Sequence, residues 1–149
     1  MRDCGGGTII NMSSVAAELS IPFQSFYSAT KAAVLSLSQA LRSEVAPFNI
    51  KVTALLPGDV KTDFTSSRRK NAQNNPAYAG RVERSVAVME RDERGGLPPE
   101  AIARTAVRLA NSKNPPVKAS GGKKDALFLF LAKILPSRLV SYIIGKMYA

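Results

Sequence analysis

The chain has 149 residues, of which 45% are hydrophobic, and a formal net charge of +10 at neutral pH. This length and hydrophobic fraction agree with one globular unit of ordinary domain size. The single cysteine excludes an intramolecular disulfide and suits a reducing, cytoplasmic compartment. The lack of histidine excludes a Cys/His zinc site and a Ser-His-Asp triad, so we predict no metal centre.

The first predicted element is a buried strand over residues 7–14 that ends in two serines. The glycines of Gly5-Gly6-Gly7 precede this strand and no helix follows them. We therefore interpret them as the turn into the strand and not as a phosphate-binding loop. Strand alternation points the side chains of Ser13 and Ser14 in opposite directions. We take Ser14 as the candidate for chemistry and Ser13 as a structural residue.

A long amphipathic helix is predicted over residues 24–46 and is stopped by Pro47. Tyr27 and Lys31 are four positions apart, so they share one helix face about a turn apart. A cation close to a phenol favours phenolate, which makes Tyr27 a candidate acid/base activated by Lys31. The Ser14 hydroxyl could hydrogen-bond the same substrate oxygen. We expect the buried surface of the helix to come from small and aliphatic residues: Ala32, Ala33, Leu35, Leu37, Ala40 and Leu41.

A second buried strand, Ile50–Leu56, leads directly into a Pro-Gly pair. Alone, a Tyr-x-x-x-Lys pair or a Pro-Gly turn proves little. The order and spacing of three motifs nevertheless resemble the short-chain dehydrogenase/reductase family. These motifs are Asn11-Met12-Ser13-Ser14, Tyr27-Ser28-Ala29-Thr30-Lys31 and Pro57-Gly58-Asp59-Val60-Lys61-Thr62.

This resemblance implies an α/β fold, the C-terminal part of a Rossmann-type doubly wound parallel sheet with a helical C-terminal extension. It implies an NAD(P)-dependent oxidoreductase that interconverts an alcohol and a ketone or aldehyde by hydride transfer. In such an enzyme Tyr27 is the acid/base, Lys31 also binds the nicotinamide ribose, and Ser14 polarises the substrate carbonyl. NAD or NADP would also contact residues of the Pro-Gly motif: Pro57, Gly58, Val60 and Thr62.

Features that precede these motifs in the family are not found in the sequence. Family members begin with a strand, a Gly-rich turn and a helix whose N-terminus binds the cofactor pyrophosphate. The asparagine of the family's catalytic tetrad would also lie upstream. We therefore expect the C-terminal part of a longer enzyme, with an open sheet edge and an uncovered apolar face. The alternative is a truncated, catalytically inactive fragment that acts at most as a partner or membrane-surface piece.

Most of the positive charge lies in residues 61–124, which hold fourteen basic and six acidic residues. This charge could favour an acidic substrate, a phosphorylated cofactor or an anionic membrane surface. Interleaved carboxylates favour the simpler interpretation of solvated helix faces, and the sparse aromatic residues argue against nucleic acid. The basic residues that we single out are Arg68, Arg69, Lys70, Arg81, Arg84, Arg91 and Arg94.

The resemblance divides the chain into a catalytic part, residues 1–65, a substrate-binding lobe with a helix, residues 66–122, and an apolar helical tail, residues 123–149. The lobe should be partly helical over residues 63–95. Further elements expected in this region are a helix from Pro98-Pro99-Glu100 to about Ala110 and a short strand at Val117–Ala119.

The tail is the most apolar part of the chain, but Lys133, Pro136 and Arg138 interrupt it before the roughly 20 apolar residues that a bilayer crossing needs. Pro136 should divide it into two short helices. Three roles stay open: a peripheral membrane contact, a lid over an apolar or lipid-like substrate, and packing against the domain or a second subunit of a homo-oligomer. Lys146 is a third basic residue beside an apolar stripe at four-residue steps: Leu127, Leu131, Leu135, Leu139 and Ile143.

Overall fold

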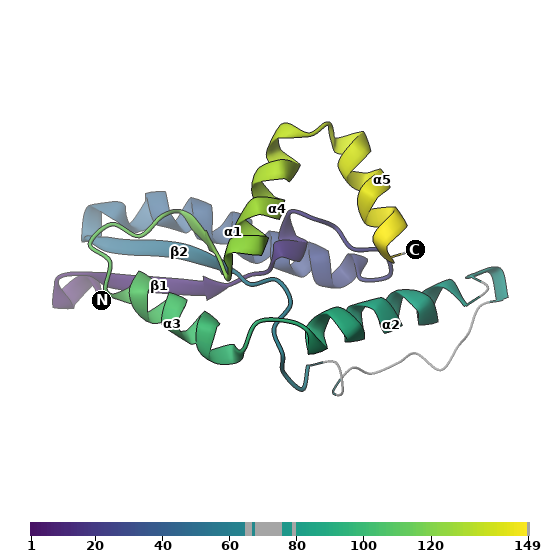
Figure 1. Ribbon diagram of the computed structural model, residues 1–149. Coiled ribbons are helices and arrows are strands. Elements are labelled where there is room, and N and C mark those ends of the chain that lie inside the picture. The colour runs from purple at the N-terminus through teal and green to yellow at the C-terminus, as the bar shows by residue number, and fades with distance from the viewer. Residues whose placement is uncertain (65–66, 68–75, 79, 149) are drawn as a thin grey trace.

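The computed structural model describes residues 1–64, 67, 76–78 and 80–148. Its described part contains a parallel sheet with strand order β1-β2-β3. The strands are β1 Gly7–Met12, β2 Ile50–Leu56 and β3 Lys118–Ser120. The α-helices are α1 Ser25–Val45, α2 Arg81–Arg94, α3 Pro99–Ala110, α4 Lys123–Ile134 and α5 Ser137–Tyr148. Short 3₁₀ turns are η1 Arg2–Cys4, η2 Val15–Ala17, η3 Ala46–Phe48 and η4 Pro76–Tyr78 (Figure 1).

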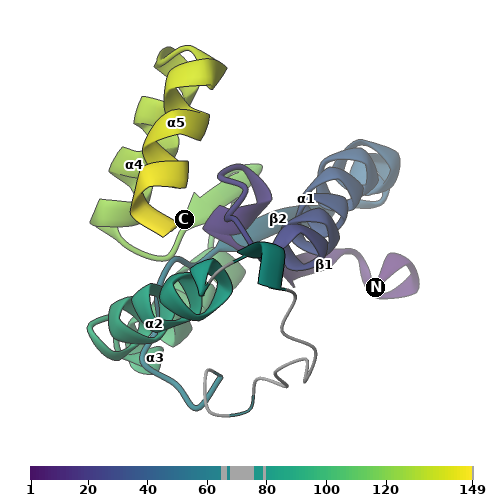
Figure 2. The ribbon, with the colours of Figure 1, turned by 90° about the vertical axis from the view of Figure 1, so that its right-hand side faces the viewer.

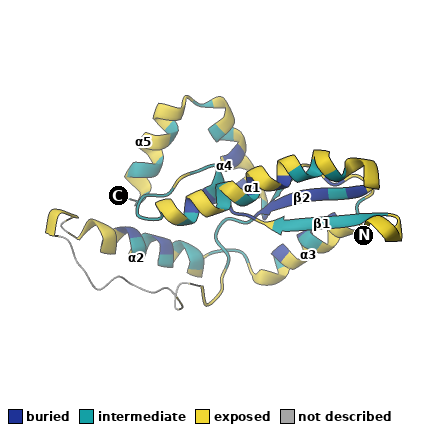
Figure 3. Ribbon diagram, turned by 180° about the vertical axis from the view of Figure 1, so that it is seen from behind, coloured by how far each residue is buried: buried dark blue, intermediate teal, exposed yellow. Residues whose placement is uncertain are grey.

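The central strand β2 organises the core, because its alternate side chains pack on opposite faces of the sheet. Leu56 joins a cluster with Leu35 of α1, whereas Leu55 joins a cluster with Ile102 and Leu109 of α3. Helices therefore cover both faces, as Figure 3 shows from behind, with the buried residues gathered on β2. The prediction of a Rossmann-type parallel α/β sheet is confirmed, whereas the expectation of an uncovered apolar face was wrong for the described strands, because α1 and α3 cover both sides.

The strand β1 lies at the edge of the sheet, where its described partner is β2. The turn before it follows the predicted glycine pattern, since Gly5 and Gly6 have φ values of 82° and 118°. A Cβ at Gly6 would overlap the backbone of Asn49, which lies just before β2. The glycines thus form the turn into the strand, as predicted from the sequence.

The prediction of which side chains α1 buries was wrong in part. Ser38 is buried against the sheet, where its hydroxyl donates to Val34 O at 2.6 Å and accepts from Asn11 Nδ2 at 2.9 Å. A hydroxyl that is paired with its own helix and with a neighbouring strand can be buried, so apolar character alone does not identify the buried face. Leu35 is buried as expected. The other predicted positions are half-buried, Ala32 and Leu41, or exposed, Ala33, Leu37 and Ala40.

Downstream of β2 the main elements were also predicted from the sequence. The helix α3 starts at Pro99 and ends at Ala110, as expected, and β3 starts at Lys118, one residue after the expected start at Val117. The basic run at residues 68–70 lies outside the described residues. The four arginines singled out on α2 are exposed, which fits solvated helix faces: Arg81, Arg84, Arg91 and Arg94. Of these, Arg91 pairs with Asp92 at 3.0 Å.

The tail forms a hairpin of two helices, α4 and α5, that bends at Leu135-Pro136 as predicted. Figures 1 and 2 show this hairpin projecting from the sheet, with the turn between its helices at the far end. Its free end returns toward α2, against which α5 packs. No described helix is long and apolar enough to cross a membrane. The five leucine and isoleucine residues do not form one stripe, because the bend gives the two helices different directions.

Candidate functional site

The chain leaves β1 through two buried serines that contact different elements. Ser13 Oγ donates to Lys31 O in α1 at 2.7 Å. Ser14 Oγ accepts from Ala16 N at 3.1 Å and donates to Pro57 O at 3.4 Å. The two hydroxyls thus diverge, as strand alternation predicts, and Ser14 is held against the Pro-Gly turn after β2.

Tyr27 lies in the first turn of α1 and is half-buried. The Lys31 Nζ atom is 5.7 Å from the centroid of the Tyr27 ring, and it donates to Met12 O at 3.2 Å. The ring of Phe64 lies beside the Tyr27 ring, with a centroid distance of 6.0 Å and an interplanar angle of 54°. The four-residue spacing therefore places both side chains on one helix face, with the ammonium over the Tyr27 ring, and the end of β1 fixes its position.

One cavity of about 870 Å³ lies at the carboxyl ends of β1 and β2, within the range of small-molecule sites. Lys31 does not line the cavity, but its ammonium contacts the Tyr27 ring and the Met12 carbonyl oxygen. The other predicted catalytic and cofactor-binding residues all line it: Ser14, Tyr27, Pro57, Gly58, Val60 and Thr62. Residues from three separate segments of the sequence therefore meet in one cavity.

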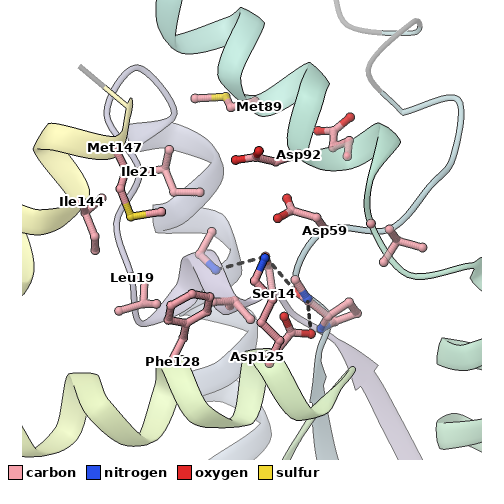
Figure 4. A pocket seen from close by; sticks show the side chains of 18 of the residues that line it. Ser14, Leu19, Ile21, Asp59, Met89, Asp92, Asp125, Phe128, Ile144 and Met147 are labelled. Atoms are coloured by element: carbon pink, nitrogen blue, oxygen red, sulfur yellow. Dashed lines mark hydrogen bonds between the residues drawn. The ribbon is translucent and has the colours of Figure 1, made fainter.

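The two tail helices supply much of the apolar wall of this cavity. Figure 4 shows Phe128, Ile144 and Met147 beside Leu19 and Ile21. Members of the expected apolar stripe that line the cavity are Leu131, Leu135 and Ile143. The inner faces of the tail thus pack against the domain and also line the cavity. Both agree with roles that the sequence left open.

Two carboxylates that the sequence analysis had not singled out, Asp59 and Asp92, lie at the side of the cavity opposite Ile144 and Met147 (Figure 4). Burial raises the pKa of Asp59, and the nearby charges of Asp92 and Asp125 raise it further. Burial, with the same Asp59 and Asp92 charges, raises the pKa of the Tyr148 phenol to about 12. These groups come from a loop and three helices, so local sequence gives no signal of their proximity.

Asp125 connects α4 to the Pro-Gly turn, because its Oδ2 accepts from Gly58 N at 3.1 Å. Burial raises the pKa of Asp125, while hydrogen bonds from the Gly58 and Gly122 amides lower it. A Cβ at Gly58 would overlap Asp125 Oδ1. One available signal in the sequence was that Asp125 is the single acidic residue of the tail.

A family model described as short chain dehydrogenase matches residues 1–73. A 3-ketodihydrosphingosine reductase from Bacteroides thetaiotaomicron is 38% identical over 152 aligned positions, which cover 100% of this chain and 56% of that protein. The chain belongs to the short-chain dehydrogenase/reductase family. The resemblance inferred from the three motifs is thereby confirmed.

Two further members of the family extend this comparison. An NADPH-dependent 1-acyldihydroxyacetone phosphate reductase from Saccharomyces cerevisiae is 31% identical over 95% of this chain and 48% of its own length. The crystal structure of a short-chain dehydrogenase from Streptomyces avermitilis superposes with a TM-score of 0.68 and 34% identity, covering 87% of this chain and 47% of that one. The chain spans about half the length of the curated relatives that it matches.

Proposed function

We propose that the protein is an oxidoreductase that interconverts an alcohol and a ketone or aldehyde with NAD or NADP. The observation that carries this proposal is that Ser14 and Tyr27 line one cavity while the Lys31 ammonium lies 5.7 Å from the Tyr27 ring. In reduction, the Tyr27 phenol gives its proton to the carbonyl oxygen, and in oxidation its phenolate takes the proton of the alcohol. The Ser14 hydroxyl donates a hydrogen bond to the same oxygen and polarises it. Lys31 places a positive charge near the Tyr27 ring.

The residues present fit the nicotinamide end of such a cofactor. The Lys31 ammonium has three donors and its hydrogen bond to Met12 O uses one, so donors remain for a ribose hydroxyl. When bound, the cofactor supplies or accepts the hydride. The cofactor is further supported by the name of the yeast relative, which is NADPH-dependent. The residues that would border the nicotinamide are Pro57, Gly58, Val60 and Thr62.

We infer an apolar or lipid-like substrate from the wall that α4 and α5 contribute to the cavity. Two relatives support this inference, since they are named as reductases of 3-ketodihydrosphingosine and of 1-acyldihydroxyacetone phosphate. Four expectations from the sequence stay predictions: the domain boundaries, a homo-oligomer, a cytoplasmic location and a peripheral membrane contact through residues 126–149.

The test is a Tyr27→Phe variant of the protein as its gene encodes it, assayed with long-chain ketones and each nicotinamide cofactor. Phenylalanine keeps the ring and removes the proton, so turnover should fall by about 100-fold to 10,000-fold. Cofactor affinity, followed by nicotinamide fluorescence, should change little. Tyr78→Phe is the matched control, because Tyr78 is exposed and does not line the cavity.

Turnover by Tyr27→Phe within a factor of a few of the unmodified protein would remove Tyr27 as the acid/base. Lys31→Met should lower both turnover and cofactor affinity, because it removes the charge near Tyr27 and the donor to the ribose. A protein that neither binds dinucleotide nor turns over any ketone would favour the alternative of a catalytically inactive partner or membrane-surface piece.

A further inference from the structure

The far end of the α4–α5 hairpin carries large apolar side chains that contribute nothing to the core. Phe130 is 59% exposed, Ile134 61% and Leu139 43%. Lys133 and Arg138 lie between them in sequence and are also exposed. Figures 1 and 2 both show the turn between α4 and α5 as the part of the hairpin farthest from the sheet. We call these five residues the hairpin tip.

The tip is separate from the faces of the hairpin that pack inward. On α4, Leu129 is buried in the core and Leu131 lines the cavity. Phe130 and Ile134 are four positions apart on another face of the same helix, with Leu127 three positions before Phe130 and 56% exposed. The helix therefore has an apolar inner face that packs against the domain and a second apolar stripe that is exposed.

The charge of the hairpin indicates what covers this stripe. Residues 123–149 contain five basic residues and one acidic residue, Asp125, which is buried. A second copy of the hairpin would bring two surfaces of the same positive sign together, which opposes self-association. An anionic lipid surface offers both the opposite charge and an apolar layer beneath it. The five basic residues are all exposed: Lys123, Lys124, Lys133, Arg138 and Lys146.

We propose that the hairpin tip docks on an anionic membrane surface. Phe130, Ile134 and Leu139 enter the boundary between headgroups and acyl chains, while Lys133 and Arg138 stay beside the lipid phosphates. The inner faces of the same two helices line the cavity, so docking places the cavity next to the layer in which an apolar substrate dissolves. Docking goes beyond the proposed oxidoreductase function and is measured without turnover.

The chain contains no tryptophan, so one introduced indole reports on a single position. Phe130→Trp places it in the tip, and Val107→Trp places it on α3 at a matched position, since Val107 is 60% exposed and Phe130 59%. With vesicles of phosphatidylcholine and phosphatidylserine at low salt, the emission of Phe130→Trp should shift to the blue and that of Val107→Trp should not. Vesicles of phosphatidylcholine alone, or high salt, should give a much smaller shift.

A charge reversal tests the electrostatic part of the proposal by vesicle co-sedimentation. Lys133→Glu with Arg138→Glu should lower the fraction bound to anionic vesicles at least tenfold. The matched control, Arg104→Glu with Arg108→Glu, makes the same change in net charge at exposed positions of α3 and should keep most of the binding. Circular dichroism checks that both pairs remain folded.

Three results would overturn the proposal. One is the lack of a blue shift for Phe130→Trp on anionic vesicles. Another is equal loss of binding by the two charge-reversed pairs, which would show that net charge alone drives attachment. A third is a blue shift without vesicles that grows with protein concentration, which would make the tip a self-association surface. Each of these leaves the assay of Tyr27 unaffected, so the two proposals fail separately.

Discussion

Asp125, at the start of α4, accepts a hydrogen bond from the backbone amide of Gly58 at 3.1 Å. The carbonyl of Pro57, in the same turn, accepts from Val15 N at 2.9 Å and from Ser14 Oγ at 3.4 Å. The Pro-Gly turn thus connects the C-terminal hairpin on one side with the candidate catalytic serine on the other. A change at Asp125, which itself lines the cavity, should therefore also affect the position of Ser14.

Asp125→Ala should lower the free energy of unfolding, because the half-buried Gly58 amide then loses its acceptor. Hydrogen bonds to charged groups are worth about 1.5–3 kcal/mol, and we expect a loss of that order in urea unfolding. Asp125→Asn retains an acceptor and removes a charge that burial disfavours, so it should lose less than half as much. Asp3→Ala, at an exposed position, is the control. Equal stability of Asp125→Ala and the unmodified chain would contradict the role.

Gly58→Ala should destabilise the same contact from the other side. The added Cβ would overlap Asp125 Oδ1, and overpacking of this kind costs about 1–3 kcal/mol. Gly145→Ala is the control, since a Cβ there meets nothing within 4 Å and alanine favours the helix. Combined with Asp125→Ala, the cost of Gly58→Ala should shrink, because the double variant removes the overlapping carboxylate. Additive effects in the double-mutant cycle would show that the two residues do not interact.

Features set by neighbouring residues were predictable from the sequence. The observed β2 has the predicted bounds, Ile50–Leu56, because this mostly apolar run, interrupted by Lys51 and Thr53, is ended by Pro57. Pro99 marks the start of α3, and Pro136 separates α4 from α5. The pairing of Tyr27 with Lys31 follows from helical periodicity alone.

Features set by contacts between distant segments were not predictable. The face of α1 that meets the sheet contains Ser38, whose hydroxyl is satisfied by Asn11 of β1, so an apolar count identified this face only in part. The contact between Asp125 and Gly58 joins residues 67 positions apart. Nothing in the local sequence indicates that the Tyr148 phenol lies near the Asp59 carboxylate.

Tyr148 should titrate late, since its pKa is raised to about 12 by burial and by the negative charges of Asp59 and Asp92. In an ultraviolet titration of phenolate absorbance, the folded chain should show a step near pH 12 that Tyr148→Phe lacks. Asp59→Asn removes one of the negative charges and should move this step to lower pH. An unchanged step in Asp59→Asn would show that the two groups do not interact.

Asp59→Asn should also change how stability depends on pH. Burial and the charges of Asp92 and Asp125 raise the pKa of Asp59 above its ordinary value of 3.8. The folded chain then binds this proton more tightly than the unfolded chain, so its contribution to stability is complete below pH 3.8 and is lost as pH rises through the raised value. At neutral pH the half-buried carboxylate opposes folding, and asparagine removes this unfavourable charge.

The midpoint of thermal unfolding of Asp59→Asn should therefore exceed that of the unmodified chain at pH 7, and the difference should shrink as the pH falls toward 3.8. Asp3→Asn, at an exposed position, should show no such trend, and subtracting its profile corrects for the change in net charge. The opposite result would be an Asp59→Asn variant that unfolds at a lower temperature than the unmodified chain at pH 7, with the difference shrinking at acid pH. This result would mean that the carboxylate has a stabilising partner at neutral pH. In that case the Asp59 side of the cavity would hold a paired charge, and the raised pKa would be the wrong description of this group.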